Sequence, residues 1–404
     1  MGLDHELAEA IEDVVTAGQL AGAVALVWRD GALAGQAAVG WRDLESDTPM
    51  TRDTIFRIAS LTKPVTAVAA MTLWEEGRFG LDEPIAERWA PEFAQMRVLA
   101  SPDGPLEDTT PAERPITFRD LLTHRSGISY GDFHAGPIGG AYREALGPDI
   151  DSPVPPEAWI AALARLPLID QPGAGFHYGA SLDLLGFLLA RMDGRPLGEV
   201  LKARVFDRLG MADTGFVPAD RGRTATLYGF DDDGRLTPYV GASDGPFYPE
   251  RPADMEYVSG GAGLWSTAED YLRFARLFLE GGAPLLKPDT VALMSENQLT
   301  PEQRARGELL GLPAFEGHGF GFGLAVVMDP AKAPATRCQG GIGTVGWPGA
   351  FGGWWQADPT DGSAMVFLAH NHLELAQLSR GVGLAVYDAI LQVHAVGSRR
   401  ERKV

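Results

Sequence analysis

The chain has 404 residues, of which 45% are hydrophobic and 22% are charged, so it is long enough for about two or three domains, or for one large domain with an insertion. Its formal net charge of −20 repels phosphate groups and anionic lipids, which argues against nucleic acid and acidic membranes as partners. The single cysteine, Cys338, excludes an intramolecular disulfide and any metal site made of several cysteines.

The chain begins with a predicted helix and a hairpin. Residues 5–18 have the periodicity of an amphipathic helix, and the hydrophobic runs 21–28 and 32–41 flank the turn Arg29-Asp30-Gly31, as two paired strands would. Residues 60–77 then predict a helix with an apolar face, which ends at Gly77. The N-terminus lacks the basic and apolar stretches of a signal peptide, so we expect a cytoplasmic protein without a membrane partner.

The middle of the chain is predicted to be mostly helical, and strands return near the C-terminus. The helix candidates are residues 117–124, 156–166, 181–192, 197–209 and 267–280, with long loops near 101–115, 131–155 and 231–256. The later strand candidates are residues 323–328, 353–357 and 364–369, followed by a helix over 373–393. The strands of the two ends can share one sheet, so we predict a sheet domain from residues 1–80 and 315–404, and a mostly helical inserted domain from 81–314.

The sharpest chemical feature is Ser60-Leu61-Thr62-Lys63 at the start of a predicted helix. Residues three apart lie on one face of a helix, so the Ser60 hydroxyl and the Lys63 amine can meet. A serine is a weak nucleophile until a neighbouring base takes its proton, and an amine can be that base where its surroundings favour the neutral form. The alternative is a serine N-cap followed by a solvated lysine.

Two glycine-rich segments add further candidates. Tyr178 follows a turn that begins at Pro172-Gly173, and a phenol beside an ammonium can act as a general base. It can equally be a core tyrosine whose hydroxyl is satisfied. Residues 346–355 combine glycines with tryptophans, and glycines let a strand edge approach a ligand closely enough for a backbone N–H to bind an oxyanion. An aromatic strand that turns beneath a helix would show the same pattern.

Together these motifs resemble the serine β-lactamase and penicillin-binding-protein superfamily, most closely its esterase branch, the family VIII carboxylesterases. The resemblance extends from about residue 10 to 390, and its motifs are Phe56 to Lys63, Leu121 to Ile128, Pro172 to Tyr178, Leu209 to Thr214 and Ser259 to Leu264. It implies an α+β fold (an α/β sandwich) in which helices flank an antiparallel β-sheet and a mostly helical domain is inserted, as in β-lactamases and transpeptidases.

The resemblance also implies a role for each site residue. Ser60 is similar to the acylated nucleophile, while Lys63 and Tyr178 are similar to the general bases, and which of the two takes the first proton stays open. The N–H groups of Ser60 and Ala350 are similar to the family's oxyanion hole, and Trp347 and Gly349 to its substrate-binding strand. No metal or other cofactor is implied, and the implied partner is a small-molecule ester.

Two departures from the lactamase pattern bear on the substrate. The segment Tyr178-Gly179-Ala180 lacks the Asn of Tyr-x-Asn, whose amide would bond a substrate amide. The segment Trp347-Pro348-Gly349 stands where lactamases commonly have Lys-Thr-Gly, so the cation that would hold a substrate carboxylate is missing. The esterase branch commonly shows Trp-Gly-Gly there, from which Pro348 departs. Both losses favour neutral esters.

We therefore expect a serine carboxylesterase that works through an acyl-enzyme on Ser60. The alternatives at the same site are a β-lactamase, a D-amino-acid peptidase, an acyl-transferring transesterase and a non-catalytic binding protein. A metal hydrolase built around His370 and His372 is a further alternative, because residues two apart on a strand face the same side. The acidic run Asp231-Asp232-Asp233-Gly234 is interpreted as a solvated turn.

Overall fold

The computed structural model describes residues 2–134, 136–240, 247, 251–252, 254–309, 312–333, 339–378 and 380–398. Cys338 lies outside these residues, as does much of the predicted loop at 231–256.

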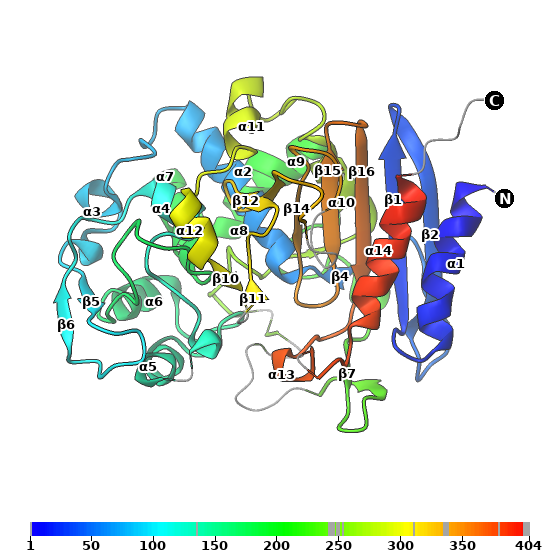
Figure 1. Ribbon diagram of the computed structural model, residues 1–404, viewed down its shortest axis with the longest axis horizontal. Helices are drawn as coiled ribbons and strands as arrows, with labels where there is room; N and C mark the ends of the chain where they lie inside the picture. The colour runs from blue at the N-terminus through cyan, green and yellow to red at the C-terminus, as the bar shows by residue number, and fades with distance from the viewer. Residues whose placement is uncertain are drawn as a thin grey trace.

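An antiparallel eight-stranded sheet joins the two ends of the chain, in the order β12-β13-β14-β15-β16-β1-β2-β3 (Figure 1). The central strand β1 (Gly22–Arg29) pairs with β2 (Ala32–Asp43) on one side and with β16 (Ser363–Ala369) on the other. The other strands of the sheet are β3 (Thr48–Pro49), β12 (His318–Phe320), β13 (Ala325–Val327), β14 (Val345–Pro348) and β15 (Trp354–Asp358). The predicted antiparallel sheet shared by both ends is confirmed.

Side chains alternate between the two faces of β1, and each face has its own hydrophobic core. Ala23, Ala25 and Val27 pack with residues of α1 (Leu3–Thr16) and α14 (Ala385–Gly397), the two helices that lie on one side of the sheet in Figure 1. Val24 and Leu26 belong to the larger core on the opposite face, where α10 (Ala268–Arg276) packs against β1 and β16.

Between β3 and β12 the chain is mostly helical, as expected, although the proposed domain bounds at 80/81 and 314/315 stay a prediction. Its helices are α2 (Thr62–Glu75), α3 (Ile85–Arg88), α4 (Phe118–Leu122), α5 (Pro137–Leu146), α6 (Pro156–Leu163), α7 (Ser181–Asp193), α8 (Leu197–Leu201), a π turn (Lys202–Phe206), α9 (Asp207–Leu209), α10, α11 (Pro288–Met294) and α12 (Pro301–Arg306). Two-stranded pairs join β4 (Phe56–Arg57) with β9 (Trp265–Ser266), β5 (Arg97–Leu99) with β6 (Thr109–Pro111), β7 (Tyr228–Phe230) with β8 (Leu236–Pro238), and β10 (Glu308–Leu309) with β11 (Leu312–Pro313). Among the described residues, no helix has both the length and the hydropathy that a membrane crossing requires.

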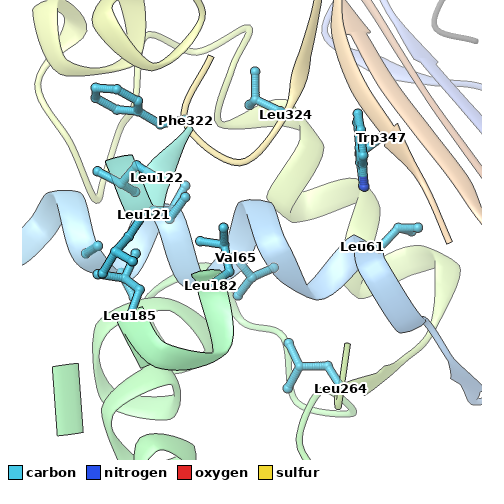
Figure 2. Packing of buried hydrophobic residues seen from close by; sticks show 14 of the residues in the cluster. Leu61, Val65, Leu121, Leu122, Leu182, Leu185, Leu264, Phe322, Leu324 and Trp347 are labelled. Carbon is cyan, nitrogen blue, oxygen red and sulfur yellow. The ribbon is translucent and has the colours of Figure 1, made fainter. Parts of the chain in front are cut away.

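The helix α2 lies in the middle of the larger core and is apolar on nearly all sides. In Figure 2 its residue Val65 lies among Leu121 of α4, Leu182 and Leu185 of α7, and Leu324. Every residue from Thr62 to Leu73 is buried, which is typical of a helix without a solvent face. The fold therefore carries the start of α2, where Lys63 lies, into the protein interior.

The predicted helix over 373–393 is wrong in its continuity. Two helices occupy this region, α13 (Leu375–Leu378) and α14, and α14 extends to Gly397. Between them Gly381 and Gly383 have φ values of 88° and 83°, a left-handed conformation that ends an α-helix. Several elements were also missed: β12 and β14 in the sheet, β6 within the predicted loop at 101–115, and α5 within the loop at 131–155.

Candidate active site

The turn that carries Ser60 is held by hydrogen bonds that join its main chain and the Thr62 side chain to Leu264. Ser60 lies in a 3-10 turn (η1, Ala59–Leu61) that leads into α2, whereas the sequence predicted a continuous helix from this residue. The Ile58 N–H donates to the Leu264 carbonyl at 2.9 Å, and the Leu264 N–H donates to Thr62 Oγ1 at 3.1 Å. Ala59 has a φ of 45°, a strained conformation for a residue with a side chain, and such strain often marks functional sites.

Lys63 is fully buried, so it is not the solvated lysine of the alternative interpretation. Its Nζ donates to Ser60 Oγ at 3.2 Å, to Tyr130 Oη at 3.2 Å and to the Gly261 carbonyl at 3.0 Å. The Nζ atom also lies 4.4 Å from the centroid of the Tyr178 ring, where the ring face attracts a cation. The predicted contact of Ser60 with Lys63 is therefore present, and Lys63 also contacts the Tyr178 ring, while the catalytic roles of the three residues stay a prediction.

Tyr178 is buried just before α7 and is held by its hydroxyl, its main chain and its ring. Trp347 Nε1 donates to Tyr178 Oη at 3.2 Å, and Ser129 Oγ donates to the Tyr178 carbonyl at 3.2 Å. The ring of Phe133 stacks on the Tyr178 ring at 5.9 Å between centroids, and the imidazole of His124 lies 4.8 Å away. Because the indole N–H can only donate, the Tyr178 oxygen acts as an acceptor in this contact.

His124 is buried against Tyr178 and takes no part in a serine–histidine pair. Both of its ring nitrogens lack hydrogen-bond partners among the described residues. Burial and the nearby Lys63 hold the pKa of His124 well below its ordinary value, so the imidazole stays neutral beside the lysine.

Two residues that the sequence analysis missed complete the surroundings of Lys63. Tyr130 Oη donates to Asp183 Oδ2 at 3.1 Å, and both residues are buried. Burial and the charge of Asp183 raise the pKa of Tyr130 well above its ordinary value, which keeps its phenol protonated. Asp183 had a signal in the sequence, because it is a lone carboxylate within the apolar stretch 182–189 of α7.

The edge of the sheet passes close to Ser60. A Cβ atom on Gly349, just after β14, would lie 2.6 Å from the Ile58 carbonyl oxygen, so the two main chains touch only because this residue is glycine. The N–H groups of Ser60 and Ala350 enter none of the hydrogen bonds described for the chain. Two free N–H groups on adjoining segments are what an oxyanion hole requires.

The remaining candidates lie elsewhere. The ring of His370 contacts Phe56, Trp265 and Phe351, and burial lowers its pKa to about 4, as it does for His372. Within the described part of the chain, no cluster of three or more histidine, cysteine or acidic side chains is arranged to hold a metal ion. The acidic run at 231–234 forms the turn between β7 and β8, as interpreted, and the Asp231 carboxylate accepts from the Asp233 and Arg235 N–H groups.

Comparison with known proteins identifies the family. A family model described as Beta-lactamase matches residues 7–378. Protein Rv1367c of Mycobacterium tuberculosis (strain H37Rv) is 44% identical over 385 residues, covering 93% of this chain and 92% of that protein. Esterase EstB of Burkholderia gladioli is 34% identical over 391 residues, covering 92% and 91%. The solved structure of EstCE1, a hydrolase with promiscuous acyltransferase activity, superposes with a TM-score of 0.79 at 29% identity and covers 96% of this chain and 98% of that one.

The chain therefore belongs to the beta-lactamase family, as the motifs predicted. The β-lactamase/transpeptidase-like fold that the resemblance implied is confirmed by the structural superposition.

Proposed function

We propose that this member of the beta-lactamase family is a serine carboxylesterase that cleaves small neutral esters through an acyl-enzyme on Ser60. The observation that carries the proposal is the contact of 3.2 Å between Lys63 Nζ and Ser60 Oγ inside a buried network. The likeness to Esterase EstB over more than nine-tenths of both chains supports the reaction class.

The proposed reaction has two halves. Ser60 Oγ attacks the ester carbonyl carbon as its proton passes to the base formed by Lys63 and Tyr178, and the N–H groups of Ser60 and Ala350 hold the negative oxygen. Collapse of this intermediate breaks the bond to the alcohol, which leaves with the transferred proton. Water then attacks the acyl-enzyme by the same route and releases the acid.

The surroundings of Tyr178 support a neutral substrate. Trp347 stands where lactamases commonly have the lysine of Lys-Thr-Gly, and its indole N–H is used by Tyr178. Trp347 and Gly349 are both buried, so as substrate-binding residues they would offer an apolar wall and a closely approaching backbone. Neither supplies a cation for a substrate carboxylate.

A series of p-nitrophenyl acyl esters and a chromogenic cephalosporin test the proposal, with the wild type, Ser60→Ala and Lys63→Ala compared. We expect the wild type to cleave the esters, both variants to lose at least about a thousandfold in kcat/KM, and the cephalosporin to react poorly. Full activity of Ser60→Ala would remove Ser60 as the nucleophile. A cephalosporin that reacts faster than the esters would establish the lactamase alternative.

Acyl transfer to an alcohol is the second candidate, because the acyl-enzyme can be released by any hydroxyl that replaces water. The acyltransferase activity in the description of EstCE1 favours it. Adding a short alcohol to the ester assay tests it, since a transesterase would form a new ester at the expense of free acid.

A further inference from the structure

Four aromatic side chains contact the Tyr178 ring, and they differ in exposure. Three of them are buried, namely His124, Tyr130 and Trp347. The fourth, Phe133, is half-buried, and its ring stacks on the Tyr178 ring with 5.9 Å between the centroids and 20° between the planes. Among the described ring contacts of Tyr178, Phe133 is therefore the one that a bound molecule can meet without displacing a buried side chain.

Phe133 ends a short 3-10 turn, η3 (Gly131–Phe133), whose main chain is anchored from outside. The Asp149 carboxylate accepts from the N–H of Gly131 at 3.1 Å and from the N–H of Asp132 at 3.2 Å. Arg143 Nη1 of α5 donates to the Gly131 carbonyl oxygen at 3.1 Å. Because the turn is already held in place, little further ordering is needed when a ligand packs on the Phe133 ring.

The chain on both sides of Phe133 is also tied to the segment of Tyr178. Ser129 Oγ donates to the Tyr178 carbonyl oxygen at 3.2 Å and lies 2.9 Å from His134 Nε2. A Cβ atom on Gly179 would lie 2.3 Å from Ser129 Cα, so the two main chains come this close only because residue 179 is glycine. The position of the Phe133 ring relative to Tyr178 is therefore fixed by the fold.

In the proposed mechanism the alcohol of the ester lies on this side of Ser60. The carbonyl oxygen is held by the N–H groups of Ser60 and Ala350, so it points to the sheet edge. The alcohol oxygen must lie within hydrogen-bond reach of the base formed by Lys63 and Tyr178, because it leaves with the proton that this base received. The carbon group on that oxygen then extends towards the side chains around Tyr178.

We infer that Phe133 is a specificity-determining residue that binds the alcohol group of the ester and favours aromatic alcohols such as benzyl alcohol. The inference rests on the proposed function of Ser60 and deepens it by naming the class of alcohol. Two aromatic rings that pack with an offset or edge to face gain more than the burial of their apolar area provides. A saturated ring of the same size buries a similar area against Phe133 but lacks this extra attraction.

Two pairs of esters test the inference. Benzyl acetate and cyclohexylmethyl acetate share the acyl group and differ only in whether the ring of the alcohol is aromatic. Ethyl phenylacetate and ethyl cyclohexylacetate carry the same two rings on the acyl side and are the control pair. The readout is the ratio of kcat/KM within each pair, which a general loss of folded enzyme or of catalytic power leaves unchanged.

Phe133→Leu is the direct test, and Phe315→Leu is its matched control. Phe315 is buried, and its ring contacts the rings of Phe176 and Phe320. Phe133→Tyr is the conservative variant, because it keeps an aromatic ring at the position. Thermal melting checks the folding of each variant, and any difference in the intrinsic reactivity of two esters is common to all four proteins.

We expect the wild type to favour benzyl acetate over cyclohexylmethyl acetate, and Phe133→Leu to lower this ratio by about two- to tenfold. Phe133→Tyr and Phe315→Leu should keep the wild-type ratio, and the acyl-side ratio should be the same in all four proteins. A Phe133→Leu variant that keeps the wild-type preference would overturn the inference. So would a loss of the preference in Phe315→Leu as large as in Phe133→Leu, or a change confined to the acyl-side pair.

Hydrolysis of p-nitrophenyl acetate by the same proteins separates this inference from the proposed function. Wild type that cleaves neither this ester nor any of the other four would overturn the role of Ser60 and everything that depends on it. Wild type that cleaves p-nitrophenyl acetate but does not favour the benzyl ester would overturn only the role of Phe133.

Discussion

Gly349→Ala is the substitution that most directly tests the arrangement of the Ser60 turn against the sheet edge. The new Cβ would lie 2.6 Å from the Ile58 carbonyl oxygen and 2.8 Å from Leu61 Cδ1, whereas real Cβ contacts are essentially never under 3.0 Å. The end of β14 and the Ser60 turn must therefore separate by at least about 0.4 Å. The atom that blocks the Cβ is in the main chain, so no side chain can rotate away to relieve the contact.

In the proposed mechanism this separation acts on catalysis through the N–H groups of Ser60 and Ala350. Losing one oxyanion donor costs about 10²–10³ in kcat, and misplacement of reacting groups by about 1 Å costs about 10². For a smaller displacement we expect kcat for p-nitrophenyl acetate to fall by about 10- to 100-fold. KM should change little, because the oxyanion forms only after the substrate has bound.

Gly353→Ala is the control for this experiment, since Gly353 lies in the same loop and its carbonyl accepts from the Gly349 N–H at 2.8 Å. A Cβ on Gly353 would have its nearest neighbours at 3.4 Å, an ordinary contact, and we expect near wild-type kcat. Melting temperatures of both variants separate loss of activity from loss of fold. If Gly349→Ala and Gly353→Ala have the same kcat, the sheet edge does not supply the oxyanion donor in the way proposed.

Three further predictions concern other parts of the molecule. Trp347→Phe removes the indole N–H that donates to Tyr178 Oη, and we expect kcat/KM for esters to fall by about three- to tenfold. The melting temperature of the variant should stay above the assay temperature, so that the loss reflects catalysis and not unfolding. Burial lowers the pKa of His370 to about 4 in the folded state, against about 6.5 in the unfolded chain, so the stability that the neutral imidazole contributes is complete above pH 6.5 and is lost as the pH falls towards 4. The loss amounts to about 3 kcal/mol of the free energy of unfolding. Urea unfolding of the wild type and of His370→Gln at pH 7 and 4.5 would measure it, because the free energy of unfolding should fall more between the two pH values in the wild type. Asp151→Asn removes the carboxylate that the buried Arg57 and Arg251 share, and we expect the free energy of unfolding to fall by about 3–5 kcal/mol. The control is Glu157→Gln, which removes an exposed ion pair with Arg191 and should lower the free energy of unfolding by less than about 1 kcal/mol.

The parts of the site that the sequence predicted are those set by short-range geometry. Ser60 and Lys63 are three residues apart at the start of one helical segment, so their contact follows from the helix itself. The hairpin of β1 and β2 likewise follows from two hydrophobic runs around a turn that contains Gly31, whose φ is 79°. Neither the Ser60–Lys63 contact nor the hairpin depends on how distant parts of the chain pack.

The parts that the sequence did not predict depend on contacts between distant segments. Tyr130 is 67 positions from Lys63 and 53 from Asp183, and no periodic pattern brings these three together. The break between α13 and α14 could have been predicted from the sequence, because Gly381 and Gly383 are a local signal that ends a helix. The prediction of one continuous helix followed the apolar periodicity of the segment instead.

The charges of the site argue most directly for the kind of substrate it accepts. Among the described residues that contact Ser60, Lys63 is the basic side chain, and its Nζ already contacts three groups of the protein, Ser60 Oγ, Tyr130 Oη and the Gly261 carbonyl oxygen. In the proposed mechanism the substrate carbonyl oxygen meets the backbone N–H groups of Ser60 and Ala350, and the neutral indole of Trp347 stands where lactamases commonly have the lysine of Lys-Thr-Gly. A substrate carboxylate placed here would have to give up its water without gaining a cation, which costs several kcal/mol. An ester carbonyl has no such cost, because it develops negative charge only in the transition state, where the N–H groups can bind it. A methyl ester should therefore react much faster than its analogue with a free carboxylate close to the scissile bond, and equal rates for the two would show that a cation not accounted for in this site binds the acid.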